Sequence, residues 1–562
     1  TGIFAIILIT LTPRFLGHSM NNPKDIPFAA SYIIAIYFTI RFLKKLPKPG
    51  WKDILLLIAA IAMGINIRIG GILTIAYLVL FLLWELISVM GLKPVFSNAG
   101  LLEILKNIKY LAIIGVGGFF GGVLFWPYGL ISPLVNPFQT LSHMSKYPIH
   151  ITILFDSKHI GSMEVPWYYI PKWMTISNPI YILTGFILSF LLIFFLKKRY
   201  QIRHVLMILF TVLFPVGYAI YNDSVLYDGW RHFLFIYPSF VVFSTLSYDY
   251  LFSLIKNKYG KVILSAGILV MLAMPFKHMV KNHPYEYVYF NEMYGGVNKA
   301  YGKYETDYYM NCVKEASEWL VKNEKLQNTD KEITIITNCI DPAKIYLSGL
   351  TDNITVKYAR YYDRNEKQWD YAIFYSRFTK RTQLVNKTWP PKGVIYTVKA
   401  DKIPLCVVLK NENNSVYLGN EALKNGDYIK AKELFEDAVE YDPNNEDANL
   451  NLGIACLYTG NFIDGINYVK KSLKILPESS VAYSTLGSAY LKLEEYDNAI
   501  KYLTMAIEQN PRNPDLYRKL GIAFRKKGNL EFAFKCFGRT LAMNPKDMQT
   551  LAYVADIYKE KE

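Results

Sequence analysis

The side chains with the most chemical potential lie in a short polar loop, Thr12 to Asp25, between two apolar stretches. The loop combines cations, an imidazole, amides and a carboxylate. Ionisable groups cost roughly 2 to 3 kcal/mol or more each at the centre of a bilayer, so those kept at the mouth of a span serve a site or an orientation signal. The candidates in this loop are Arg14, His18, Asn22 and Asp25.

Apolar stretches that are nearly free of charge fill the chain up to about residue 276, although the protein has 562 residues in all. Several approach the roughly 20 residues that cross a bilayer as a helix, and others are short, as in tilted or re-entrant helices. We count about nine, and they lie at residues 1–11, 28–40, 54–63, 71–90, 110–127, 180–196, 205–220, 233–246 and 262–275. Residues 1–276 are therefore predicted to form a polytopic α-helical membrane domain.

Lysine and arginine cluster in alternate loops, which predicts the orientation of the spans. The cation-rich loops lie at residues 41–52, 93–109, 197–203 and 256–261, and loops of this kind face the cytoplasm. The other loops and everything beyond Lys277 are then extracytoplasmic, in a multi-pass protein of the cell inner (plasma) membrane. The net charge of +16 is largely a topology signal, and because no basic face with interleaved aromatics accompanies it, we expect no nucleic acid partner.

Three further loops on the same predicted face carry polar and aromatic side chains. Arginine suits a phosphate, because its planar guanidinium gives paired donors to the oxygens. Trp and Tyr suit the faces of sugars, or an interfacial aromatic belt. Histidine and carboxylate groups in these loops are able to hold a divalent metal. The other candidates for a donor phosphate or substrate are Asn66, Arg68, Tyr227, Asp228, Trp230 and Arg231.

A strict period of 34 residues marks the last third of the chain. The recurring residues include Gly419, Gly453, Gly487 and Gly521, and Pro443, Pro477, Pro511 and Pro545. Small residues let paired helices approach closely, and each proline falls where a helix must stop. The pattern resembles the tetratricopeptide repeat in four copies, which predicts an α-solenoid over residues 411–562 with a capping helix from Met548 to Tyr558. Its inner face would bind a protein partner, or the array serves as a spacer or oligomerisation arm.

Residues 277–410 combine a connecting segment with a small α/β domain. Helical patterns at residues 313–323 and 342–347 alternate with strand-like runs at 333–337, 354–358, 371–375, 394–398 and 405–409. The segment has no glycine-rich phosphate loop and no serine-nucleophile motif, so we do not expect a second active site there.

Four groups of residues follow one another in order within residues 1 to about 300. They are Thr12-Pro-Arg-Phe with Gly17-His18 and Asn22-Pro-Lys-Asp25, then Gly64-Ile-Asn66-Ile-Arg68, then Pro166-Trp-Tyr-Tyr169 with Pro179, and Trp230-Arg231-His232 with Pro238. This ordered set resembles the polytopic GT-C glycosyltransferases, and most of all the bacterial members of glycosyltransferase family 39. These are relatives of protein O-mannosyltransferases and aminoarabinose transferases.

The resemblance implies transfer of a sugar from a polyprenyl-phosphate donor to a protein or lipid acceptor at the outer membrane face. In that family a carboxylate on the first external loop is the general base of an inverting displacement, and we expect it upstream of Thr1. Asp25 then takes the family's second acidic position, beside the donor phosphate or a metal. Arg68 and Arg231 are the expected contacts of the lipid phosphate, and His232 contacts a metal or the phosphate.

Two other classes of function fit parts of the sequence. A non-enzymatic membrane anchor that displays the repeats for envelope assembly would explain the 34-residue array and a missing base. Such an anchor needs only one or two spans. It would not have about nine spans with Arg, His and Asp placed repeatedly at the same membrane face. In a transporter the polar groups would lie along the spans and not at one mouth. We therefore favour the transferase, while a charge that anchors a helix end remains the structural alternative for each site residue.

Overall fold

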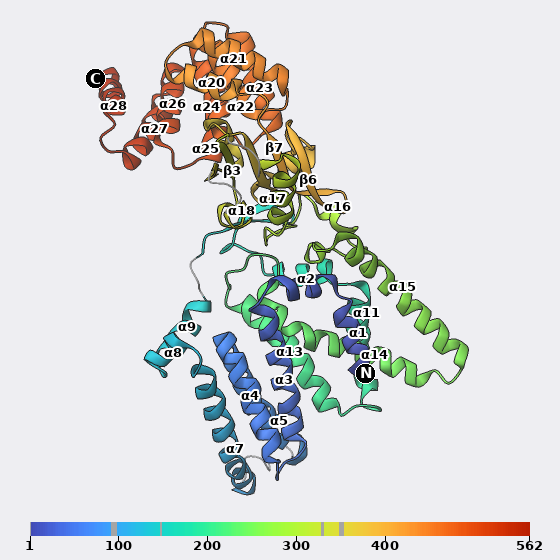
Figure 1. Ribbon diagram of the computed structural model, residues 1–562. Coiled ribbons are helices and arrows are strands. Elements are labelled where there is room, and N and C mark those ends of the chain that lie inside the picture. The colour runs from blue at the N-terminus through green and yellow to red at the C-terminus, as the bar shows by residue number, and fades with distance from the viewer. Residues whose placement is uncertain (1, 91–97, 146–148, 327–330, 348–352, 562) are drawn as a thin grey trace. The chain divides into compact units, whose positions relative to one another are not determined.

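The computed structural model describes residues 2–90, 98–145, 149–326, 331–347 and 353–561 (Figure 1). The chain divides into two compact units. Unit 1 comprises Thr1–Tyr309 together with Ala400–Ile403, and unit 2 comprises Met310–Lys399 and Pro404–Glu562. The boundaries predicted at residues 276 and 410 stay predictions.

Unit 1 is built almost entirely of helices. A short antiparallel hairpin of β1 (Thr152–Phe155) and β2 (Lys158–Gly161) interrupts the long loop before α10, and the sequence analysis did not foresee it. The main helices are α1 (Gly2–Thr10), α2 (Pro13–Asn21), α3 (Asp25–Leu43), α4 (Trp51–Ile67), α5 (Leu73–Met90), α7 (Asn98–Val123), α8 (Pro127–Ile131), α9 (Asn136–Ser145), α10 (Tyr169–Ser177), α11 (Ile180–Leu191), α12 (Ile193–Leu196), α13 (Ile202–Tyr221), α14 (Tyr237–Leu254), α15 (Lys258–Asn282) and α16 (Gly296–Ala300).

Fewer of these helices than expected meet the requirements of a complete span. Within the described residues, four helical stretches are long and apolar enough: α3, Ile69–Ser88, α13 and α15. The count rises to six if α1 with α2, bent by 73°, and α10 with α11, bent by 119°, each form one broken span or re-entrant loop. Several of the nine apolar stretches fold into helices that are too short to pass this test, such as α11, which has only 12 residues, and the count of about nine spans stays a prediction.

Close helix packing forms the core of unit 1 around α3, α4, α5 and α7. In α7, a methyl group on Gly118 or Gly122 would come within 2.6 Å of Ile61 or Ile65 of α4. Small residues at such crossings let helix backbones approach, as is common between helices in membranes.

Unit 2 begins with a five-stranded mixed sheet in the order β4-β3-β5-β7-β6. β3 pairs in parallel with β4 and β5, and β5 pairs antiparallel with β7. The structure confirms the predicted strands and helices of this region. The elements are α17 (Cys312–Asn323), β3 (Ile333–Thr337), α18 (Ile340–Leu347), β4 (Ile354–Tyr358), β5 (Tyr371–Tyr375), α19 (Arg381–Asn386), β6 (Val394–Ala400) and β7 (Ile403–Lys410).

The 34-residue period corresponds to four pairs of antiparallel helices and a final helix. A methyl group on Gly487 would lie 2.5 Å from Leu503 Cγ, which explains why the period keeps glycine where the two helices of a pair cross. The helices are α20 (Ser415–Lys424), α21 (Tyr428–Tyr441), α22 (Glu446–Tyr458), α23 (Phe462–Ile475), α24 (Ser480–Lys492), α25 (Tyr496–Gln509), α26 (Pro514–Lys526), α27 (Leu530–Met543) and α28 (Met548–Lys561).

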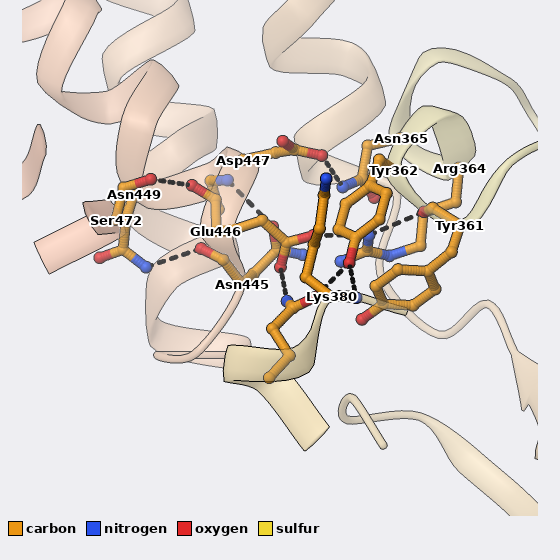
Figure 2. A network of polar contacts seen from close by, with 12 residues as sticks. Tyr361, Tyr362, Arg364, Asn365, Lys380, Asn445, Glu446, Asp447, Asn449 and Ser472 are labelled. Carbon is orange, nitrogen blue, oxygen red and sulfur yellow. Dashed lines mark hydrogen bonds and ion pairs between the residues drawn. The ribbon is translucent and has the colours of Figure 1, made fainter. Parts of the chain in front are cut away.

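A buried ion pair joins the sheet region to the first repeats (Figure 2). Arg364, in the 3-10 helix η5 (Tyr361–Glu366), donates from Nη1 to Glu446 Oε1 at 2.8 Å, and neither side chain is more than 4% exposed. Burial opposes the charge of Arg364, but Glu446 outweighs it and raises the pKa of the guanidinium. Beside it, Asn365 Nδ2 donates to Asp447 at 2.7 Å. The sheet and the repeats are therefore fastened to one another within unit 2.

Candidate active site

The predicted loop from Thr12 to Asp25 contains a helix, α2, which begins directly after a bend at Thr12. Proline at the first position of α2 needs no backbone N–H donor there. The Thr12 hydroxyl donates to the Leu8 carbonyl at 2.9 Å and lies 2.9 Å from the Tyr237 hydroxyl of α14. These contacts fix the direction in which α2 leaves α1.

The residue Gly17 brings α2 against the segment that follows the last span. A methyl group here would lie 2.5 Å from the backbone nitrogen of Tyr287, so only glycine allows this approach. On the same helix, Arg14 is 1% exposed and donates to the Tyr308 hydroxyl at 3.0 Å and to the Tyr289 carbonyl at 2.9 Å. Its guanidinium lies 5.4 Å from the ring centre of Trp173. Arg14 thus ties distant parts of unit 1 together.

One turn further along α2, His18 is fully buried between two tyrosines. Its Nε2 lies 2.8 Å from the Tyr308 hydroxyl, and its Nδ1 lies 2.9 Å from the Tyr309 hydroxyl. Asp307 Oδ1 accepts from the Tyr309 backbone N–H at 3.0 Å and from the Tyr287 hydroxyl at 2.7 Å. This turn holds the two tyrosines over α2.

The end of α2 leads into a pair of charged residues from different loops. Asn22 Nδ2 donates to Asp25 Oδ2 at 2.6 Å and to the Tyr309 hydroxyl at 2.8 Å. The other carboxylate oxygen of Asp25 accepts from Arg68, which directly follows α4. The first and second predicted outer loops therefore meet at Asp25.

The fourth predicted loop adds a second arginine–carboxylate pair. Arg231 lies 3.0 Å from Asp228, and its guanidinium lies 5.3 Å from the centre of the Tyr227 ring. The Tyr227 ring in turn contacts His232 edge to face, with 4.7 Å between the ring centres. We use the name charge cluster for Lys24, Asp25, Arg68, Asp228 and Arg231.

Positive charge predominates in the charge cluster, which holds three cations and two carboxylates. Burial and the nearby charge of Arg231 lower the pKa of Arg68 to about 10. Partial burial, followed by the charges of Arg68 and Arg231, lowers the pKa of Lys24. Burial and the same three cations lower the pKa of His232 to about 3, so its imidazole is neutral. Each added positive charge is disfavoured here, whereas an anion would be stabilised.

The structure brings most of the predicted site residues together, but two of them face other parts of unit 1. Asn66 Nδ2 donates to the Gly122 carbonyl of α7 at 3.4 Å. Trp230 is 2% exposed, and its indole N–H donates to the Ser177 hydroxyl at 2.9 Å. Packing accounts for both side chains, and their contact with a substrate stays a prediction.

Sequence reasoning missed Lys24, Tyr308 and Tyr309. Lys24 lies inside the predicted loop, and its distance of one residue from Asp25 was the available signal. The tyrosines lie about 290 positions from His18. The only signal for them was a tyrosine-rich run just after the last span, at residues 301–309.

The proposed metal ligands Asp25 and His232 do not fit a divalent cation well in this arrangement. The two carboxylate oxygens of Asp25 are engaged by Asn22 and Arg68, and the charge cluster repels a further cation. Among the described residues, no group of three or more His, Cys, Asp or Glu side chains is placed to hold a metal ion. A metal requirement stays a prediction that this donor set does not favour.

Known proteins share the two ends of the chain. Residues 1–105 match the family described as dolichyl-phosphate-mannose-protein mannosyltransferase, and residues 422–488 and 480–513 match tetratricopeptide repeats. The chain joins a GT-C mannosyltransferase-family region to tetratricopeptide repeats. The mannosyltransferase-family region contains Arg14, Asp25 and Arg68, and its apolar helices fit a membrane glycosyltransferase.

Solved structures resemble the repeats. The crystal structure of MamA is 28% identical, over 26% of this chain and 84% of that chain, with a TM-score of 0.25. MamA from Desulfovibrio magneticus RS-1 is 19% identical, over 26% and 83%, with a TM-score of 0.25. YrrB, described as a tetratricopeptide repeat protein with an unusual peptide-binding site, is 20% identical, over 25% and 73%, with a TM-score of 0.24. The search of curated proteins gives no match.

The tetratricopeptide repeats contain a groove between α22, α24 and α26, with a volume of about 340 Å³. Its lining includes Ser484 and Ser488 of α24, and Ile454 and Leu457 of α22. Ile454 and Ser488 are one period apart, at the position that Asn420 holds in the first repeat. Asn420 Nδ2 donates to the Asn365 carbonyl of η5 at 3.0 Å, so a segment of the chain itself lies on this face of the first repeat.

Proposed function

We propose that unit 1 transfers a sugar from a polyprenyl-phosphate donor to a protein or lipid acceptor at the outer face of the cell inner membrane. The match to a mannosyltransferase family supports a membrane glycosyltransferase, and mannose is the first sugar to test. The observation that carries the proposal is the surplus of positive charge in the charge cluster, where burial and then the neighbouring cations lower the pKa values of Arg68 and Lys24.

A lipid phosphate relieves this surplus. Arginine side chains bind phosphate oxygens through paired N–H donors, and Arg68 and Arg231 are 14% and 24% exposed, so part of each guanidinium is open to a ligand. Asp25 and Asp228 hold the two arginines in place. A phosphate bound between them takes over the role of balancing their charge.

The same cations would promote the transfer step. The acceptor hydroxyl oxygen forms a bond to the anomeric carbon of the sugar, while the bond from that carbon to the phosphate oxygen breaks. Negative charge grows on the departing polyprenyl phosphate, and fixed cations stabilise a developing charge more than the ground state. The hydroxyl proton passes to a general base, which in the family that the chain resembles is a carboxylate.

Binding of polyprenyl phosphate to the full chain in lipid nanodiscs tests the proposal. We expect Arg68→Ala and Arg231→Ala each to weaken binding about tenfold or more, which corresponds to about 1.4 kcal/mol. Arg199→Ala is the matched control, because Arg199 is also paired with an aspartate, Asp249, but lies in a predicted cytoplasmic loop. Equal binding by all three variants would contradict the phosphate assignment.

The tetratricopeptide repeats would hold a protein acceptor or another protein partner. The groove over α22, α24 and α26 offers serine hydroxyls for contacts with a peptide backbone and apolar side chains such as Ile454 and Leu457 for contacts with its side chains. At the first repeat the equivalent surface already contacts a polypeptide segment, η5, through Asn420. With the C-terminal domains extracytoplasmic, as proposed, the groove would face acceptors outside the cytoplasm. Loss of protein glycosylation, with donor binding kept, is the expected result of Ser484→Lys with Ser488→Lys.

A membrane-anchored scaffold for envelope assembly is the second candidate function. The buried Arg364–Glu446 pair favours it, because a rigidly mounted repeat array suits the display of partners. The two functions separate experimentally. A scaffold keeps its cellular role when Arg68 and Arg231 are both replaced by alanine, whereas a transferase loses it.

A further inference from the structure

The imidazole of His18 is held by a tyrosine hydroxyl at each ring nitrogen. Tyr308 contacts Nε2 at 2.8 Å and Tyr309 contacts Nδ1 at 2.9 Å. A neutral imidazole has one N–H donor and one acceptor nitrogen. The two hydroxyls therefore decide which nitrogen carries the proton, and their other partners decide what each hydroxyl is able to do.

Asp25 determines which groups donate and which accept in these hydrogen bonds. An ionised carboxylate only accepts hydrogen bonds, so the atom of Asn22 that faces Asp25 Oδ2 at 2.6 Å must be the amide nitrogen. The amide oxygen of Asn22 accepts from the Asp25 backbone N–H at 2.8 Å, which agrees with this orientation. The second N–H of the Asn22 amide then donates to the Tyr309 oxygen at 2.8 Å.

A second positive group also acts on the hydroxyl of Tyr309. The charge of the guanidinium of Arg231, which carries only donors, acts on the Tyr309 hydroxyl. A phenolic oxygen that accepts from Asn22 and faces this charge turns its lone pairs toward both groups, and its O–H toward the imidazole. The Tyr309 O–H must therefore donate to His18 Nδ1.

The ring proton of His18 then resides on Nε2. This N–H donates to the Tyr308 oxygen, which also accepts from Arg14 Nη1 at 3.0 Å. A doubly protonated ring would direct an N–H at Tyr309, whose lone pairs are turned toward Asn22 and Arg231. The arrangement thus selects one neutral form of the ring.

We propose that Tyr309 and Tyr308 are positioning residues that hold His18 as a neutral imidazole protonated on Nε2. Asp25 and Arg231 set this state through Asn22 and Tyr309, so the phosphate-binding end of the site controls the histidine that lies behind it. The functional meaning of this control rests on the proposed function, whereas the state of the ring does not.

Nitrogen NMR of the full chain in lipid nanodiscs, with ¹⁵N-labelled histidine and no donor added, tests the inference. The signals absent from His18→Gln identify His18. We expect a protonated Nε2 and an unprotonated Nδ1 in the native chain. Tyr309→Phe removes the donor to Nδ1 and should shift the Nδ1 signal or give a mixture of both neutral forms, whereas Tyr308→Phe should keep Nδ1 unprotonated.

Tyr301→Phe is the matched control, because the Tyr301 hydroxyl is also buried in unit 1 but has no hydrogen-bond partner among the described residues. It should leave the His18 signals unchanged. A proton on Nδ1 in the native chain, or a doubly protonated ring, would overturn the inference even if a variant fails to fold. So would an unchanged spectrum in a folded Tyr309→Phe variant. Failure of Arg231→Ala to weaken polyprenyl phosphate binding would instead overturn only the proposed function.

Discussion

Both compact units place arginines beside carboxylates where water has little access, but the two arrangements differ in the balance of positive and negative charge. In unit 2, Arg364 and Glu446 form a pair that is at most 4% exposed on either side. In unit 1, the charge cluster pairs each of two arginines with an aspartate and still holds a third cation, Lys24, whose pKa is lowered by partial burial and then by the charges of Arg68 and Arg231. We call the Arg364–Glu446 pair the closed pair, because its two charges balance. We call the charge cluster the open surplus, because it has one more cation than carboxylates and would be stabilised by an added anion.

This difference separates a structural pair from a binding site. Removing one member of a closed buried pair leaves an uncompensated charge, so the cost falls on stability. Removing a cation from an open surplus lowers the repulsion among those that remain, so the cost falls on ligand binding. Burial of an arginine alone therefore does not identify function, but the balance of charge around it does.

The largest expected effect concerns the closed pair. Glu446→Gln removes the hydrogen-bonded counter-charge of the buried Arg364, although the charge of Asp447 remains nearby, and should destabilise unit 2 by about 3 to 5 kcal/mol. The double variant Arg364→Met with Glu446→Leu should recover most of this loss, since apolar residues of similar volume replace buried pairs well. Hydrogen exchange of the α22 backbone amides in the full chain measures both. A single variant as stable as the double would contradict the closed-pair interpretation.

The open surplus should respond in the opposite way. Arg231→Gln should reduce polyprenyl phosphate affinity about ten- to a hundredfold, or about 1.4 to 2.8 kcal/mol, while the midpoint of thermal unfolding changes little. Isothermal titration and a melting curve on the same sample compare the two quantities. If the melting temperature falls steeply while the affinity for polyprenyl phosphate is unchanged, Arg231 has a structural role and not a binding role.

Two glycines compare the rigidity of the two units. Gly17→Ala directs a methyl group at the backbone nitrogen of Tyr287, 2.5 Å away, and Gly487→Ala directs one at the Leu503 side chain, also at 2.5 Å. A backbone yields less than a side chain, so Gly17→Ala should cost more, about 1 to 3 kcal/mol. Gly217→Ala, with no neighbouring atom within 4 Å, is the control. Thermal unfolding of the three variants would show whether this order holds.

The smallest expected effect is a pH dependence of opposite sign in the two units. His232 has its pKa lowered to about 3, so below about pH 6.5 the unfolded state takes up a proton that the folded state does not, and unit 1 loses roughly 1 kcal/mol by pH 5.5. Burial, followed by the charge of Glu446, raises the pKa of Asp447 to about 6. Protonation of Asp447 therefore favours the folded state, and unit 2 gains stability as the pH falls from about 6 towards 4.

Hydrogen exchange between pH 7 and 5, read separately for amides of η2 (Arg231–Ile236) and of α22, distinguishes these trends. His232→Gln should reduce the loss in unit 1, to which the buried His18 also contributes, and Asp447→Asn should remove the gain in unit 2. Parallel trends in both units would contradict the contrast.

Local patterns predicted most of the fold. The strand β3 begins and ends where its apolar run does, at Ile333 and Thr337, and the 34-residue period fixed the helix pairs of the repeats, because each repeat packs mainly on its neighbours. The spans were harder, since an apolar stretch such as α11 does not reveal from its composition whether it crosses the bilayer or bends with α10.

The site was predictable only where topology brought loops to one membrane face. Arg68, Asp25 and Arg231 were found in this way, and they do lie together. Tyr308 and Tyr309 were missed because they reach His18 from a segment that no residue pattern connects to α2. The helical form of α2 was also missed, because Thr12 to Asp25 was predicted as a polar loop between two apolar stretches.

The contact between η5 and the first repeat has a consequence for how this array can grow. Since Asn365 lies on the inner face at Asn420, and Arg364 anchors the start of α22, the beginning of the array is committed to the sheet. Extra repeats inserted between α27 and α28 would lengthen the accessible groove, whereas extra repeats inserted before α22 would separate η5 from its partners. The array is extensible in one direction only, which makes its C-terminal end the place where new partner specificity can be added at little structural cost.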